Sequence, residues 1–201
     1  MNQQPAADYG AHETMEMHEV LCGTINCINT FQLFQQHVVD PGLRQILDRQ
    51  LDFLNNEYNN MVNALHTHGR SQAVPYRAQT GGTPKYGLRQ PAPAAPNASA
   101  QQLDDRDIAS CMLSSAKNSA TTRMHAALEC ANPTLRSMLL QAAQNSAEMA
   151  YETWTFMNQK GYYQVPTMMQ QTTQTMINVY QPGNENTLQA GAANQTWKPL
   201  Q

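Results

Sequence analysis

The sequence predicts an all-α protein, a four-helix bundle made of two helical hairpins that are joined by a long Pro-rich crossover. Apolar residues recur at intervals of three and four over four long stretches, which is the spacing of one helix face. A helix-start motif that begins at Pro41 occurs again at Pro133. Between the two copies, residues 70–103 are rich in Pro, Gly and Ala and show no such periodicity.

The repeated motif predicts two long helices with the same start and stop signals. Each copy begins with a short acceptor residue that suits the N-cap, followed by a proline at the first helical position, where the missing N–H costs nothing. Each copy ends at a glycine that suits the left-handed position after a helix. These matched pairs, at one constant spacing, are Asp40 and Asn132, Pro41 and Pro133, and Gly69 and Gly161.

The first hairpin is expected over residues 13–69, after a disordered lead-in at residues 1–12. Its first helix is expected over about residues 13–37 and its second from Pro41 onward. The short turn between two long helices makes an antiparallel pair. The expected inward positions are Met17, Leu21, Ile25, Ile28, Phe31, Phe34 and Val38 in the first helix, and Leu43, Leu47, Leu51, Leu54, Tyr58, Met61 and Leu65 in the second.

Residues 70–103 are expected to form a linker without regular structure, because they hold five of the 11 prolines. Fully extended, such a segment spans on the order of 100 Å, whereas a 28-residue helix is only about 42 Å long. The linker can therefore return the chain to either end of a bundle, and its length does not decide the topology.

The second hairpin is expected over residues 104–161. Its first helix opens with an acidic turn and ends before Asn132, and its second runs from Pro133 to about Lys160. The order hairpin, long connection, hairpin is that of a ferritin-like four-helix bundle. The expected inward positions of the first helix are mostly small: Ala109, Ala116, Ala120, Ala127 and Ala131, with Leu113 and Met124.

Residues 162–201 are expected to form a Tyr- and Gln-rich tail, with a short helix over about residues 167–180 and disorder beyond Pro182. The tail suits docking onto other copies or partners, or covalent cross-linking through its Gln and Tyr side chains. A simple disordered terminus explains its composition equally well.

The composition excludes several classes of function. The net charge is -3 and 13% of the residues are charged, which argues against a nucleic-acid or anionic-membrane surface. Gln and Asn make up about a fifth of the chain, and a surface with few charges repels its neighbours weakly, so it can assemble. Residues 1–19 lack the features of a signal peptide, and no membrane span is expected. The four Cys show no Cys-x-x-Cys spacing and are expected to act as small hydrophobic residues.

A bundle of this kind can hold a di-metal carboxylate site, which needs Glu-x-x-His on two of its helices. Glu57 and Glu148 are followed three positions later by Asn60 and Tyr151, so the histidine is missing from both. The six His show no ligand spacing, and no nucleophilic triad or phosphate loop stands out. No catalytic, cofactor-binding or metal residue is therefore assigned. A site could still be assembled from Glu16, Glu19, Glu57, Glu129 and His125, although surface groups and intrahelical pairs explain these residues more simply.

Several separated motifs lie in register with a known family. Residues 105–109 read Asp-Arg-Asp-Ile-Ala, Lys117 follows, and residues 129–136 read Glu-Cys-Ala-Asn-Pro-Thr-Leu-Arg. Residues 156–165 read Phe-Met-Asn-Gln-Lys-Gly-Tyr-Tyr-Gln-Val. With these motifs the second half resembles the spore coat protein F family, and residues 9–44 are similar to the leading hairpin of its longer members.

The resemblance implies a ferritin-like bundle without a catalytic centre, and a structural component of the bacterial endospore coat. Such a protein is made in the mother-cell cytoplasm, is located in the spore coat and acts by assembly with other coat proteins, with self-association also open. No cofactor and no nucleic-acid partner are implied. The alternative is a ferritin-like di-metal (iron or manganese) oxidase or peroxide-handling enzyme, for which the carboxylates named above would have to converge on one interior point.

Overall fold

The computed structural model describes residues 9–67, 72–91, 93 and 95–183. These residues form five α-helices and one 3-10 turn, Ala100–Gln102, so the predicted all-α class is confirmed. Their only β-type pairing is a pair of isolated bridges that join Val165 to Tyr86 and Gly87. Residues 1–8 of the expected lead-in and residues 184–201 of the expected tail lie outside the described residues. Among the helices of the described part, none is long and apolar enough to cross a bilayer.

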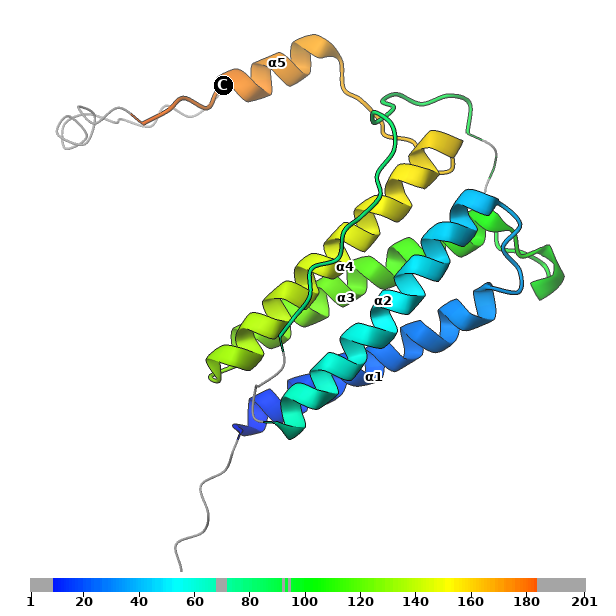
Figure 1. Cartoon of the computed structure of the whole chain (residues 1–201). Helices are drawn as coiled ribbons and strands as arrows, with labels where there is room; N and C mark the ends of the chain where they lie inside the picture. Colours follow the sequence, from blue (N-terminus) through cyan, green and yellow to red (C-terminus); the bar gives the residue numbers. More distant parts are fainter. Residues whose placement is uncertain (1–8, 68–71, 92, 94, 184–201) are drawn as a thin grey trace, which may run out of the picture. The chain divides into compact units, whose positions relative to one another are not determined.

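The four long helices are α1 (Ala11–Phe34), α2 (Pro41–His66), α3 (Asp105–Glu129) and α4 (Pro133–Lys160), shown in Figure 1. Helix α1 begins slightly before the expected residue 13 and ends before the expected residue 37. Its end differs because residues 35–37 tighten into a turn, in which the amides of Gln36 and His37 bond to carbonyls three positions back.

The predicted helix starts form as expected from their chemistry. The Asp40 side chain accepts hydrogen bonds from the amides of Gly42 and Leu43, and the Asn132 side chain accepts the equivalent pair at the start of α4. Gly161 ends α4 with a φ of 80°, which is the left-handed conformation that glycine adopts without a steric penalty. The matching Gly69 lies outside the described residues.

The four helices pack side by side in the cyclic order α1, α2, α4, α3. Helices α1 and α4 each pack against both α2 and α3, an arrangement compatible with the expected four-helix bundle. Two of the lines of contact lie on opposite sides of this ring. We call the surface along α1 and α3 the α1–α3 seam, and the surface along α2 and α4 the α2–α4 groove.

The two hairpins hold each other's turns through carboxylates. Asp105, at the start of α3, accepts hydrogen bonds from the amides of Val39 and Asp40 in the α1–α2 turn. Glu13, in the first turn of α1, accepts one from the amide of Asn132 in the α3–α4 turn. The same sequence spacing separates Glu13 from Asp105 and Asp40 from Asn132, so the internal repeat extends to these contacts.

Residues 72–91, which we call the strap, return the chain from the end of α2 towards the start of α3. The strap lies in the α2–α4 groove and runs in the direction of α4, because strap residues Tyr76 and Lys85 bond in order to Asn145 and Asn158 (Figure 1). The strap is therefore bound to the rest of the bundle at several points between residues 74 and 89.

The core consists of two apolar clusters. One surrounds Phe31, Leu47 and Ile108, and the other surrounds Met17, Met61 and Leu139. Most of the expected inward positions are buried, but three are exposed, contrary to the prediction. Ala131 is exposed because it lies beyond the end of α3 at Glu129. Ile25 is 40% exposed and Met124 is 43% exposed. Both lie on the outer side of helices whose apolar residues are not confined to one face, so periodicity alone misplaced them.

A second unit of the chain comprises residues 166–201 and contains α5 (Gln170–Asn178). The helix is shorter than the expected range of 167–180, and none of its residues is buried.

Candidate functional site

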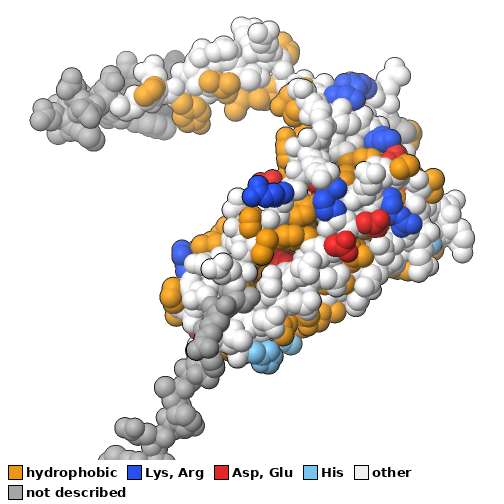
Figure 2. Space-filling model, viewed as in Figure 1, with side chains coloured by type: hydrophobic (Ala, Val, Ile, Leu, Met, Phe, Trp, Pro, Cys, Tyr) orange, Lys and Arg blue, Asp and Glu red, His pale blue; other side chains and the backbone are white. Residues whose placement is uncertain are grey.

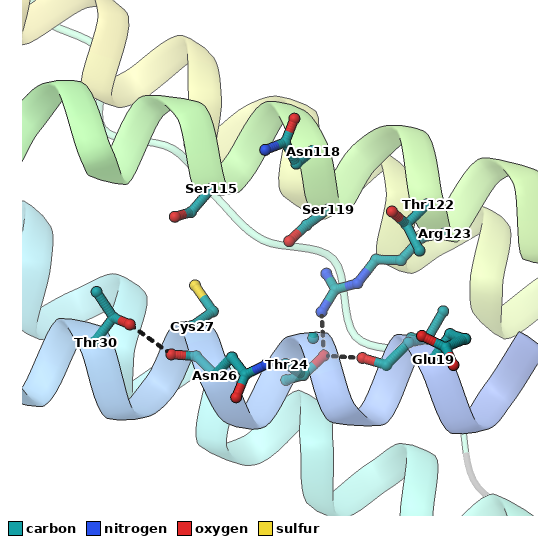
Figure 3. Close-up of a pocket in the computed structure, with 12 residues that line it drawn as sticks. Glu19, Thr24, Asn26, Cys27, Thr30, Ser115, Asn118, Ser119, Thr122 and Arg123 are labelled. Carbon is teal, nitrogen blue, oxygen red and sulfur yellow. Dashed lines mark hydrogen bonds between the residues drawn. The ribbon is translucent and has the colours of Figure 1, made fainter.

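A buried guanidinium group joins all four helices in the middle of the bundle. Arg123 of α3 is 2% exposed. Its Nη1 lies 2.8 Å from Oε2 of Glu57 in α2 and donates to Oγ of Ser146 in α4 at 2.6 Å. Its Nη2 donates to Oγ1 of Thr24 in α1 at 3.1 Å, a contact that Figure 3 shows crossing between the two helices. Each helix contributes at least one polar side chain to this layer, which separates the two apolar clusters.

Glu57 is the carboxylate of the layer. Burial raises the pKa of Glu57, while the charge of Arg123 and the hydrogen bond from Asn145 oppose that rise. Asn145 Nδ2 donates to Glu57 Oε1 at 2.8 Å. The carboxylate of Glu57 is thus bound by one cation and one amide, and this environment suits a role in holding the helices together.

A second buried carboxylate, Glu152 of α4, connects the helices to the strap. It is 1% exposed, and its Oε1 lies 2.8 Å from Nη2 of Arg49 in α2. It also accepts hydrogen bonds from the hydroxyl of Tyr76 and the amide of Gln79 in the strap. Burial is the largest cause of a raised pKa of Tyr76, and the hydrogen bond to Glu152 adds to it.

The carboxylates of the di-metal alternative lie in separate places. Glu57 pairs with Arg123 inside the bundle. Glu16 lies 3.6 Å from His125 and Glu129 lies 3.6 Å from His12, both at the surface of the α1–α3 seam. Glu19 is exposed. Among the described residues, no three His, Cys, Asp or Glu side chains are grouped so that they could hold a metal ion.

A cleft of about 250 Å³ opens on the α1–α3 seam above Arg123. Its walls are short polar side chains, among them Asn26 and Thr30 on α1 and Ser115 and Ser119 on α3, drawn in Figure 3. Cys27 also lines it, and burial raises the pKa of this thiol to about 11. A thiol with that pKa stays protonated near neutral pH and is a poor nucleophile.

Side-chain amides bind the strap through its backbone. Asn158 donates to the carbonyl of Lys85 at 3.0 Å and accepts from its amide at 2.7 Å. Gln164 makes the same pair of bonds with Arg89. Asn145 donates to Val74 O at 2.9 Å and accepts from Tyr76 N at 2.8 Å. Because these hydrogen bonds are made to backbone amides and carbonyls, the strap is held in place without forming a helix or a strand.

The sequence did not reveal that Arg123 and Arg49 pair with the buried acids Glu57 and Glu152. It also did not reveal that side-chain amides hold the strap. Arg123 falls in a helix of small residues, where a lone Arg is normally assigned to the surface. Its one available signal was its position, three residues before Ala126 and seven after Ala116, which places it on the inward face of α3.

Comparison with known proteins gives three consistent similarities. Residues 104–166 match the Coat F domain family. The chain is 33% identical over 175 residues to the spore coat protein F-like protein YhcQ of Bacillus subtilis (strain 168), covering 86% of this chain and 81% of YhcQ. A crystal structure of a candidate spore coat protein from Bacillus halodurans C-125 superposes with a TM-score of 0.59 at 15% identity, covering 80% of this chain and 95% of that one. The last similarity concerns the fold.

Proposed function

Because the chain belongs to the spore coat protein F-like family, we propose that it is a structural, non-enzymatic component of the bacterial endospore coat. The observation that carries the proposal is the similarity to YhcQ, which extends over both hairpins and is not limited to the Coat F domain. The protein would be made in the mother-cell cytoplasm and act in the coat by assembly with other coat proteins.

The interior supports a structural role. In related bundles, carboxylates on facing helices hold metals. Here the inward carboxylate Glu57 pairs with the guanidinium of Arg123. The second one, Glu152, is bound by Arg49 and by the Tyr76 hydroxyl of the strap. A fixed internal guanidinium balances the charge of one carboxylate, but it offers no open coordination position for chemistry.

The test of the proposal is the location of the protein during sporulation. A fluorescent fusion, produced from its own promoter in the spore-forming host, should form a shell around the forespore and remain with purified spores. A fusion that stayed dispersed in the mother cell would contradict the proposal.

Elemental analysis separates the structural role from the di-metal enzyme. Protein purified after expression with abundant iron and manganese should carry far less than one metal ion per chain. A carboxylate di-metal centre needs two ions, so a content of about two would support the enzyme.

A further inference from the structure

The strap is a basic surface on a chain that is acidic overall. Residues 58–103 contain four Lys or Arg and no Asp or Glu, although the chain has a net charge of -3. Arg77 and Arg89 are exposed, and within the described residues neither forms an ion pair. Figure 2 shows Lys and Arg side chains on the face over which the strap runs, with Asp and Glu side chains next to some of them. The strap therefore presents cations that no acid in the described part of the chain pairs with.

Exposed apolar side chains lie beside these cations along the strap. Val74 is 54% exposed, Tyr86 is 67% exposed and Leu88 is 63% exposed. The backbone beneath them is fixed by Asn145, Asn158 and Gln164, so they are presented on a rigid support. Such a mixture of apolar and charged groups on a pre-organised surface is typical of a protein-binding site.

The opposite face of the bundle carries the complementary charge. Glu16, Glu19 and Glu129 lie on the α1–α3 seam near the start of α1. Two apolar residues adjacent to them in sequence are also exposed, Met15 at 67% and Leu128 at 70%. Among the described residues, the ion-pair partners near these acids are both histidines, with His125 beside Glu16 and His12 beside Glu129.

The two surfaces cannot meet within one molecule. The strap occupies the α2–α4 groove, and the acidic residues lie on the α1–α3 seam, on the other side of the ring of helices. A basic surface and an acidic surface on opposite faces of one molecule can satisfy each other only between copies. Such a contact uses different patches on the two partners, so it can repeat from copy to copy.

We propose that the strap of one copy docks on the acidic end of the α1–α3 seam of a second copy, so that copies associate head to tail. The inference rests on the proposed function, and it specifies how a coat component of this kind would self-associate. Arg77 and Arg89 supply the cations that face the acidic patch of Glu19 and Glu129 on the neighbouring copy, and the exposed apolar residues of both patches cover each other. Complementary charge sets the orientation and speeds the encounter.

The experiment measures the mass of the full-length protein by light scattering across a salt series. The wild type should form species larger than a monomer at low ionic strength, and their population should fall as salt is raised, because exposed charges are screened beyond about 10 Å at 0.1 M. A wild type that stays monomeric at low salt overturns the proposal.

Two double variants test the two faces. The variant Arg77→Glu with Arg89→Glu reverses the charge of the strap. The variant Glu19→Lys with Glu129→Lys reverses the charge of the acidic end of the seam. All four positions are exposed, so the helical circular dichroism and melting temperature should be preserved. The two variants change the net charge in opposite directions, yet each should be monomeric under conditions in which the wild type associates. If association depended on net charge alone, the two would respond in opposite ways, and that result overturns the proposal.

Mixing provides the sharpest test. An equimolar mixture of the two variants restores opposite charges across the contact, so larger species should reappear. The matched control is Asp52→Lys, which reverses the charge at an exposed position on α2. This variant should associate as the wild type does. A mixture that stays monomeric overturns the proposal. A coat-located fusion together with a monomeric purified protein would refute head-to-tail docking and leave the proposed function intact, whereas a dispersed fusion would refute the function itself.

Discussion

Arg123 is the residue on which the interior depends most. It bonds to groups on α1, α2 and α4 from its place on α3, so its loss would affect every helix contact at that level. A buried ion pair contributes little when compared with an apolar pair, but removing one partner leaves an unpaired buried charge.

Replacement of Arg123 by Met should therefore be strongly destabilising. The expected loss is about 3–5 kcal/mol in the free energy of unfolding, because Glu57 would lose its cation while still buried. Urea denaturation followed by circular dichroism measures it.

The double variant Arg123→Met with Glu57→Met is the control. It removes both charges at similar volume, so it should recover most of the lost stability. A double variant as unstable as the single one would show that Glu57 is not the group left unpaired.

Residue chemistry was predictable where it is local. Asp40 and Asn132 behave as N-caps because the capping bond is made to amides two and three positions away, so the sequence alone contains both partners. Arg123 and Glu57 lie 66 positions apart and Arg49 and Glu152 lie 103 positions apart. Pairs of this kind depend on the packing of whole helices, which residue spacing within one helix does not reveal.

At the scale of elements, the reciprocal carboxylate contacts hold the two hairpins together at both ends of the bundle. Glu13 bonds to the amides of Asn132 and Gly10, and Asp105 bonds to the opposite turn. Each hairpin thus supplies an acceptor for free amides of the other, in places where secondary structure provides none.

The contact made by Glu13 should make stability depend on pH. Hydrogen bonds from the Asn132 and Gly10 amides lower the pKa of Glu13 below its ordinary value of 4.5. Its stabilisation is therefore complete above pH 4.5 and is lost as the pH falls through the lowered pKa of the folded state. The difference in unfolding free energy between wild type and Glu13→Gln should shrink as the solution is acidified. A difference that grew at low pH would contradict this account.

The strap should resist proteolysis because its backbone is bound. Trypsin can cleave after Lys85, whose amide and carbonyl are both held by Asn158. Asn158→Ala removes both bonds, worth about 1–2 kcal/mol, and should speed cleavage there by about 5- to 30-fold. Mass spectrometry of timed digests measures the rate. Asn118→Ala, at an exposed position on α3, should digest like the wild type.

At the scale of the whole molecule, the number and order of the long helices followed from the sequence. The repeat beginning at Pro41 and Pro133 gave the ends of the hairpins, and the apolar stripes gave their packing faces. The course of the linker could not be predicted from the sequence. Its Pro- and Gly-rich composition predicts the absence of helix and strand, but it does not predict that the strap lies in the α2–α4 groove. The ferritin-like relationship stays a prediction.

Removal of residues 166–201 should leave the bundle intact. No residue of α5 is buried, and the segment belongs to a separate unit. The melting temperature of a chain ending at Val165 should match that of the full chain within about 2 °C, because a change of 1 kcal/mol corresponds to about 2–4 °C at this size. A larger drop, measured by calorimetry, would show that the tail stabilises the bundle.

The backbone bonds of the strap have a further consequence for experiments in heavy water. The amides of Tyr76, Gln79 and Lys85 each donate to an α4 side chain, and the amide of Gly87 donates to a backbone carbonyl. Within the part of the chain that the structure describes, the amides between these positions have no such acceptor. Deuterium uptake should therefore be slow at isolated amides and fast at their neighbours, an irregular pattern unlike the continuous protection of a helix. The strap has no regular secondary structure, but the few slowly exchanging amides would identify the positions at which it is bound to the rest of the chain.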